Sequence, residues 1–314
     1  MNHYLGIDLG GTNIAIGMVN ETGKLLCQSS TPTESKGGYP HVLGRMIALA
    51  EQVIADSGIA RDTLRAVGIG SPGICDSEAG IIRFASNLDF HDVPICADLH
   101  AHFNLPVNLE NDANAAALGE GLAGAARGTK SSVTITLGTG LGSGIVVEER
   151  IVRGMFGCGG EFGHSTIKFD GLLCGCGLRG CYEMYASTTG LIRQAREAAQ
   201  AHPNSMLSTN VEGDLSAITG RTIFAAKHGG DDMANQVVDQ YLDYVTIGLA
   251  NLASTLCPEA FVIGGGLSAQ GDTIILPLRE KTEKYVFGGK LYGKIVAATL
   301  GNDAGIIGAA IAAK

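Results

Sequence analysis

Two glycine-rich breaks, each flanked by short apolar segments, constrain the possible folds of this chain more than any other feature. The first break, Gly10-Gly11-Thr12, separates apolar residues 4–9 from residues 14–19, and the second, Gly138-Thr139-Gly140, follows about 130 residues later. Short apolar segments bounded by glycine predict strands, so each break predicts a β-hairpin. The spacing exceeds the ~20–50 residues of solenoid repeats. It therefore indicates two related α/β lobes, with chance similarity of two hairpins as the alternative.

The remainder of the chain alternates between strand and helix patterns. Apolar residues from Met233 to Leu256 recur at helical spacing, and Pro258 ends that helix. The polar stretch 201–213 predicts a surface loop. Further strands are predicted at 24–28, 66–69, 107–109, 133–137, 144–147 and 261–263, and further helices at 46–54 and 113–126. This alternation is typical of an α/β protein.

Composition supports a folded, acidic protein of about two domains. Hydrophobic residues make up 45% and charged residues 17% of 314 positions, which allows a sizeable core and excludes a disordered chain or a coiled coil. Glycine occurs 46 times, about twice its usual share, so glycines must serve turns and close backbone approaches. A net charge of −9 and the lack of tryptophan argue against a nucleic-acid partner.

Targeting and membrane patterns are not visible in the sequence. The first residues lack the basic and apolar regions of a signal peptide, and no apolar stretch approaches the ~20 residues that span a bilayer. We therefore expect a cytoplasmic protein without membrane contact. In that compartment the eight cysteines are expected to be reduced thiols or metal ligands.

Three cysteines and a histidine form the most specific motif. Cys174, Cys176 and Cys181 lie within eight residues of one another, and His164 lies ten residues before the first of them. Three thiolates and one imidazole are a closed, tetrahedral donor set for structural zinc. The alternative is three reduced cysteines in a loop, which leaves the clustering of three of eight cysteines unexplained.

Two glutamates flank this motif in the sequence. A metal-bound loop that holds both Glu161 and Glu183 would direct two carboxylates to one place. Carboxylates suit sugar hydroxyls because they accept strong hydrogen bonds. The alternative is that both are solvated surface acids, which is the usual position of glutamate.

An Asn-Asp pair marks the junction between a predicted strand and a predicted helix. Asp112 there is either the N-cap of the helix or a general base at the carboxyl end of a strand, where α/β folds place their chemistry. One residue can serve in both ways, and Asn111 beside it can hold a substrate hydroxyl.

Both hairpins carry groups that suit phosphate. Asp8 and the turn Gly10-Gly11-Thr12 supply a carboxylate for hydrated Mg²⁺, backbone N–H groups and a hydroxyl. Thr139-Gly140 offers a second cradle without an acid. A rival fingerprint, Gly68-x-Gly70-x-x-Gly73, suits a dinucleotide-dependent dehydrogenase, but Pro72 lies inside it and no convincing helix follows.

Taken together, these motifs resemble the ROK family (repressors, open reading frames and kinases) of sugar kinases, and within it the zinc-containing bacterial glucokinases. The similarity covers essentially the whole chain. It rests on the segments Asp8-Leu9-Gly10-Gly11-Thr12, Glu110-Asn111-Asp112-Ala113, Leu137-Gly138-Thr139-Gly140, Gly160-Glu161-Phe162-Gly163-His164, Cys174-Gly175-Cys176-Gly177, Gly180-Cys181-Tyr182-Glu183, Gly264-Gly265-Gly266 and Asn302-Asp303-Ala304-Gly305.

The resemblance implies an actin-like ATPase fold, the α/β fold of hexokinase, Hsp70 and actin, with two related lobes around a central cleft. The first lobe would comprise residues 1–114 and about 302–314, and the second residues 115–301. The resemblance also implies ATP with Mg²⁺, structural Zn²⁺ and a homodimer.

The same resemblance assigns roles to individual residues. Asp112 would take the proton from the 6-hydroxyl of a hexose, and the zinc ligands would be His164, Cys174, Cys176 and Cys181. Sugar contacts would come from Asn87, Asn111, Asp112, Glu161, His164 and Glu183. The nucleotide and its metal would be held by Asp8, Gly10, Gly11, Thr12, Asn13, Thr139, Gly140, Gly264, Gly265 and Gly266.

Substrate choice stays open at this level. Glucose is the first candidate, with mannose, fructose, allose, N-acetylmannosamine and N-acetylglucosamine as alternatives, and polyphosphate as an alternative donor. A sugar-binding regulator without activity is the other class of function within the family. Many relatives carry proline where this chain has Ser86, which puts the shape of the loop beside Asn87 in question.

Overall fold

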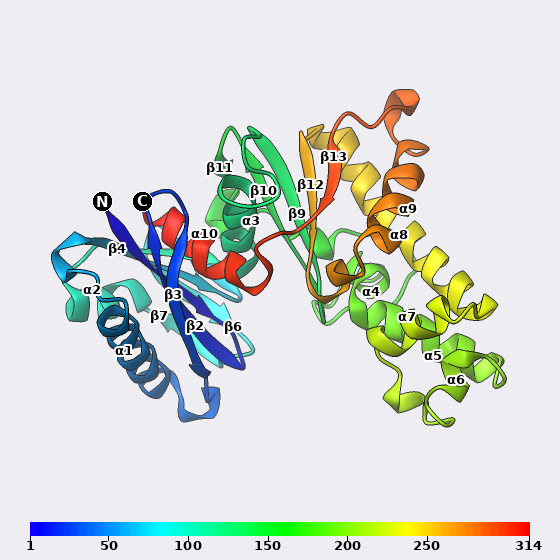
Figure 1. Cartoon of the computed structure of the whole chain (residues 1–314), viewed down its shortest axis with the longest axis horizontal. Coiled ribbons are helices and arrows are strands. Elements are labelled where there is room, and N and C mark those ends of the chain that lie inside the picture. Colours follow the sequence, from blue (N-terminus) through cyan, green and yellow to red (C-terminus); the bar gives the residue numbers. More distant parts are fainter. The chain divides into compact units, whose positions relative to one another are not determined.

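The first predicted hairpin lies at the centre of a five-stranded sheet (Figure 1). The sheet contains β1 (His3–Leu9), β2 (Asn13–Asn20), β3 (Leu25–Pro32), β4 (Leu64–Ser71) and β8 (Val107–Asn111), in the order β3-β2-β1-β4-β8. Strand β1 pairs antiparallel with β2 and parallel with β4. The carboxyl ends of β1, β4 and β8 therefore lie at one edge, where Asp8 and Asn111 are found.

Side chains of β1 alternate between two faces because successive residues of a strand point in opposite directions. Leu5, Ile7 and Leu9 belong to the core cluster that includes α1 (Tyr39–Asp56) and α2 (Ile95–Phe103). Tyr4 belongs to the other cluster, with residues of α10 (Ala304–Ala312). The sheet is thus covered on both faces.

Helix α10 approaches its neighbours backbone to backbone. A Cβ added to Gly6 of β1 or Gly68 of β4 would lie 2.0 Å and 1.8 Å from carbonyl oxygens of α10. A Cβ added to Gly308 of α10 would lie 1.6 Å from the carbonyl oxygen of Ala115 in α3 (Asp112–Leu122). These glycines serve the close approaches that the composition predicted.

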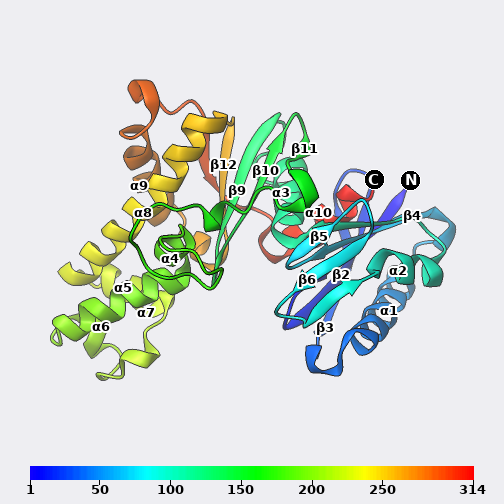
Figure 2. The same ribbon diagram turned by 180° about the vertical axis from the view of Figure 1, so that it is seen from behind.

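A small three-stranded sheet was missing from the sequence-based prediction. It consists of β5 (Ile74–Asp76), β6 (Ile81–Ala85) and β7 (Phe90–Val93), in that order; Figure 2 labels β5 and β6, and Figure 1 labels β7. These strands are only three to five residues long, and their polar and apolar residues do not alternate regularly. Such short segments give little periodicity from which to predict a strand.

The second predicted hairpin belongs to another five-stranded sheet (Figure 1). Its strands are β9 (Ser131–Leu137), β10 (Leu141–Val147), β11 (Arg150–Ile151), β12 (Ala260–Gly264) and β13 (Lys294–Ala297), in the order β11-β10-β9-β12-β13. Strands β12 and β13 are parallel. The strand-turn-strand pattern predicted twice is therefore confirmed in both sheets.

The remaining helices lie between β11 and β13 in the sequence: α4 (Glu183–Ala186), α5 (Thr188–Ala201), α6 (Met206–Thr209), α7 (Gly220–His228), α8 (Asp232–Leu256) and α9 (Asp272–Glu283). The predicted helix before Pro258 is confirmed as α8, which Asp231 caps by accepting a hydrogen bond from the Ala234 N–H group. The surface loop predicted at 201–213 is interrupted by the short helix α6, which Ser205 caps. In the described part of the chain, none of the helices has both the length and the apolar composition of a membrane-spanning segment.

The computed structural model describes residues 1–314, apart from the side chain of Phe156. Two compact units are present. Unit 1 comprises Met1–Thr134, Ser143–Gly160 and Ala298–Lys314, and unit 2 comprises Ile135–Gly142 and Glu161–Ala297. The lobes expected from the resemblance stay a prediction. Unit 1 also contains residues 115–134, 143–160 and 298–301, which the prediction assigned to the second lobe; among them are most of α3, which packs against α10, and β11.

Candidate functional site

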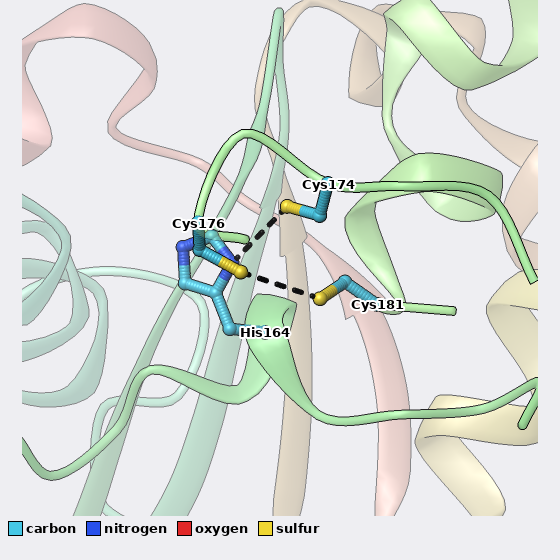
Figure 3. A group of neighbouring side chains, drawn as sticks. All are labelled: His164, Cys174, Cys176 and Cys181. Carbon is cyan, nitrogen blue, oxygen red and sulfur yellow. Dashed lines mark hydrogen bonds between the residues drawn. The ribbon is translucent and has the colours of Figure 1, made fainter. Parts of the chain in front are cut away.

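The predicted metal ligands converge in unit 2 (Figure 3). One ligand atom from each of His164, Cys174, Cys176 and Cys181 lies within 4.8 Å of all the others. The Cys174 Sγ atom is 3.7 Å from His164 Nδ1, and the Cys176 and Cys181 Sγ atoms are 3.6 Å apart. Donor atoms about 2.0–2.3 Å from one tetrahedral zinc ion lie about 3.3–3.8 Å from each other, so these residues fit the ion.

The loop around the cluster folds through backbone hydrogen bonds. The N–H group of Cys174 donates to the Leu178 carbonyl, and the N–H group of Gly177 donates to the Cys174 carbonyl. Gly177 and Gly180 have φ angles of 89° and 76°, which favour glycine. Burial raises the pKa of the Cys174 thiol to about 12. A cation at the centre would favour the thiolate instead.

Glu183 lies between this cluster and the second hairpin. Its Oε1 atom accepts a hydrogen bond from Cys174 Sγ at 3.1 Å and lies 3.7 Å from His164 Nδ1. Its Oε2 atom accepts from the Leu141 N–H group at 3.4 Å. Glu161 precedes the 3₁₀ turn that ends at His164, and the two are joined by a backbone hydrogen bond of 3.1 Å. Both flanking glutamates are therefore close to the histidine in the chain or in space.

In unit 1, Asn111 is the N-cap of α3. Its Oδ1 atom accepts hydrogen bonds from the N–H groups of Ala113 and Asn114 at 2.9 Å and 3.2 Å. Asp112 is the first residue of the helix, so the cap role considered for it belongs mainly to its neighbour. Burial raises the pKa of Asp112, although hydrogen bonds from Ala113 and Asn111 oppose the shift.

Glu110, two residues before Asp112, is a buried acid that the sequence did not indicate as part of a site. It is 2% exposed, and its carboxylate accepts from Arg153 Nε at 2.7 Å and Asn114 Nδ2 at 3.0 Å. A charge at this depth needs such partners. This network fixes the backbone at the end of β8, where Asn111 and Asp112 follow.

The first hairpin brings Asp8 and Asn87 together with the glycine turn. A Cβ on Gly11 would meet the Cβ atom of Asn87 at 2.9 Å, so the two residues are in contact. The turn closes by a hydrogen bond of 2.9 Å from the Gly10 N–H group to the Asn13 carbonyl. Burial, and then the nearby charge of Asp112, raise the pKa of Asp8 to about 6. The carboxylates of Asp8 and Asp112 therefore influence each other.

The second hairpin and the 264–266 glycines are neighbours in unit 2. The hairpin closes by a hydrogen bond of 3.1 Å from the Gly138 N–H group to the Gly140 carbonyl. Gly265, with a φ angle of 80°, lies so close to Leu137 that an added Cβ would be 2.5 Å from its backbone. The predicted nucleotide residues from these two segments thus share one edge of the second sheet.

Comparison with known proteins decides the family. The ROK family model matches residues 4–314. The chain belongs to the ROK family. A curated relative, "Glucokinase" from Streptomyces coelicolor, is 39% identical over 314 residues, which cover 99% of this chain and 97% of the relative. As a member of this family, the chain has the actin-like ATPase fold.

Solved structures of ROK proteins superpose over nearly the whole chain. A ROK family glucokinase from Streptomyces griseus, in complex with glucose and AMPPNP, has a TM-score of 0.82 and 37% identity and covers 98% of each chain. ROK hexokinase from Thermus thermophilus has a TM-score of 0.83 and 36% identity, with 99% of this chain and 97% of that chain covered. The family resemblance seen in the motifs is confirmed.

Proposed function

We propose that this ROK protein transfers the γ-phosphoryl group of ATP to the 6-hydroxyl group of a hexose, with glucose as the preferred acceptor. Relatives named glucokinase align along nearly the whole chain, and one of them was solved with glucose and an ATP analogue. The observation in this structure that carries the proposal is that Asn111, and not Asp112, is the N-cap of α3. Because Asn111 supplies the cap, Asp112 keeps a carboxylate oxygen for chemistry.

Asp112 is the proposed general base. It accepts the proton of the sugar hydroxyl as the oxygen attacks phosphorus, and its raised pKa makes it a better proton acceptor than an exposed aspartate. Phosphoryl transfer otherwise depends on positioning and charge stabilisation. Asp8 is the proposed carboxylate for hydrated Mg²⁺, an ion that neutralises charge on the transferred phosphate when bound.

We further propose that the His164, Cys174, Cys176 and Cys181 cluster holds structural zinc. The four donors are complete without water, as in other closed zinc sites. With the ion bound, His164 and Glu183 would be held in one orientation, which suits them for sugar hydroxyls together with Glu161. Asn87 and Asn111 are the proposed sugar contacts in unit 1. A homodimer, a cytoplasmic location and a role in the first step of glycolysis also remain proposals of this kind.

The decisive assay measures ADP release from Mg-ATP with a panel of free sugars. We expect turnover with glucose to exceed that with mannose, fructose, allose and the two N-acetylhexosamines. An N-acetylated sugar as the best acceptor would replace glucose in the proposal. No turnover with any sugar, in zinc-replete protein, would favour the alternative function, a sugar-binding regulator without kinase activity.

Asp112→Asn tests the base. The variant should keep the fold and glucose binding but lose about 10²–10⁴-fold in kcat. Asp62→Asn, an exposed aspartate elsewhere in unit 1, is the matched control and should keep full activity. Near-normal turnover of Asp112→Asn would leave Asp112 as a helix-terminal residue without a catalytic role.

A further inference from the structure

Two adjacent threonines hold three consecutive carbonyl groups of the second hairpin. The N–H group of Thr188 donates to the Gly138 carbonyl at 2.9 Å, and its hydroxyl donates to the Leu137 carbonyl at 3.1 Å. The hydroxyl of Thr189 donates to the Thr139 carbonyl at 2.6 Å. All of these residues belong to unit 2.

The first bond follows from the position of Thr188 in its helix. Thr188 is the first residue of α5, and the first N–H groups of a helix have no partner within it. Ser187, the N-cap, satisfies the N–H group of Gly190 through its hydroxyl. The Thr188 N–H group is left for a partner outside the helix, and the hairpin carbonyl takes that place.

Engaged carbonyl groups change what the hairpin can present to a ligand. A phosphate is bound by backbone N–H groups, and a carbonyl oxygen that turned toward it would repel it. Thr139 and Gly140 are exposed at the tip, so the orientation of the peptide planes there depends on the hydrogen bonds of the hairpin, of which Thr188 and Thr189 supply three. We propose that Thr188 and Thr189 are positioning residues that hold the hairpin in its nucleotide-binding conformation. This inference rests on the proposed assignment of Thr139-Gly140 to the phosphates of ATP.

The chain segment just before Thr188 also belongs to the metal cluster. Cys181 and Glu183 come six to eight residues before Thr189, and Glu183 accepts from the Leu141 N–H group on the other side of the hairpin. The stretch 181–189 therefore contacts the hairpin from both of its ends. Thr189 is the more informative target because its hydroxyl makes a single bond and lies on the surface.

The test replaces Thr189 by valine, which keeps the shape but lacks the hydroxyl, and by serine, which restores it. Calorimetry measures the Kd for AMPPNP with Mg²⁺, and steady-state kinetics measure KM for ATP and for glucose. We expect T189V to raise Kd and the KM for ATP about 2- to 10-fold, the effect of one net hydrogen bond. The KM for glucose and the Tm should not change, and T189S should return the nucleotide values to those of the wild type.

Thr255→Val is the matched control. The Thr255 hydroxyl also donates to a carbonyl, that of Asn251 at 2.7 Å, but on the exposed face of α8. T255V should therefore leave nucleotide binding unchanged. An unchanged Kd for AMPPNP in T189V would overturn the inference, as would a joint rise of both KM values with a lower Tm, which indicates a general structural role. If the wild type binds AMPPNP but phosphorylates no sugar, the proposed function fails, and the Kd comparison still decides the role of Thr189.

Discussion

Adding one methyl group at Gly308 should separate α10 from α3. The new Cβ would lie 1.6 Å from the Ala115 carbonyl oxygen, 2.5 Å from its carbonyl carbon and 2.9 Å from the Gly119 nitrogen. Real Cβ contacts essentially never fall below 3.0 Å. All three neighbours are backbone atoms of α3, so no side-chain rotation relieves the overlap. The two helices would have to move apart by more than an ångström, or α3 would have to distort.

The expected cost lies at the upper end of the overpacking range. Extra groups in a packed core typically cost about 1–3 kcal/mol, and a backbone obstacle leaves the fewest ways to relax. With about 2–4 °C of Tm per kcal/mol for a unit of this size, ~3 kcal/mol corresponds to a decrease of about 6–12 °C. Since α3 begins with Asp112, kcat should fall as well.

Gly44→Ala is the matched control for Gly308→Ala. Gly44 lies within α1, and an added Cβ meets no atom within 4 Å. Alanine is the better helix former by about 0.8–1 kcal/mol, so this variant should raise the Tm slightly. Thermal unfolding followed by circular dichroism measures both variants. A Gly308→Ala protein with the Tm of the wild type would refute the close approach of α10 and α3.

Two further predictions concern the pKa of Asp8 and the His164, Cys174, Cys176 and Cys181 cluster. Because burial raises the pKa of Asp8 from 3.8 to about 6, its protonated form stabilises the fold at low pH, and this stabilisation is lost as the pH rises through about 6. In Mg²⁺-free thermal melts, the Tm advantage of Asp8→Asn over the wild type should therefore grow from pH 4 to pH 7.5, and a constant difference would contradict the shift. Cys176→Ser should lower the zinc content found by elemental analysis, and it should either raise the KM for the sugar or unfold the protein. Cys257→Ser, at an exposed cysteine outside the cluster, should leave zinc content, KM and folding unchanged. Native protein without zinc would exclude the metal.

Local patterns predicted the hairpins and the cluster because short-range geometry determines both. Three cysteines within eight residues are confined by chain length alone. The N-cap of α3 could not be predicted from local sequence, because asparagine and aspartate are both favoured at an N-cap and Asn111 and Asp112 are adjacent. The structure selects Asn111 because its extended φ and ψ angles, −67° and 148°, continue strand β8. That choice depends on pairing with β4, which the sequence does not display.

Long-range partners were beyond prediction for the same reason. The Glu120 carboxylate is 1% exposed and accepts hydrogen bonds from the N–H groups of Thr299 and Leu300, at 3.0 Å and 2.7 Å, about 180 residues away. The helix predicted to reach residue 126 ends at Leu122, and the same carboxylate accepts from the Ala125 N–H group. A glutamate in an alanine-rich helix is normally a solvated residue, so nothing in its surroundings indicated this role.

The glycines of α10 connect the composition of the chain to its proposed chemistry. A Cβ on Gly305 would lie 2.7 Å from the Asp8 carboxylate, and a Cβ on Gly308 would overlap the α3 backbone three residues after Asp112. Gly305 therefore faces the Asp8 carboxylate, and Gly308 faces the backbone of the helix that begins with Asp112, at two positions where an added Cβ would overlap. Because the helix supplies backbone instead of polar side chains there, Asp8 loses water without gaining a cation, and this raises its pKa. The close packing of α10 thus stabilises unit 1 and tunes the acid that we propose for Mg²⁺.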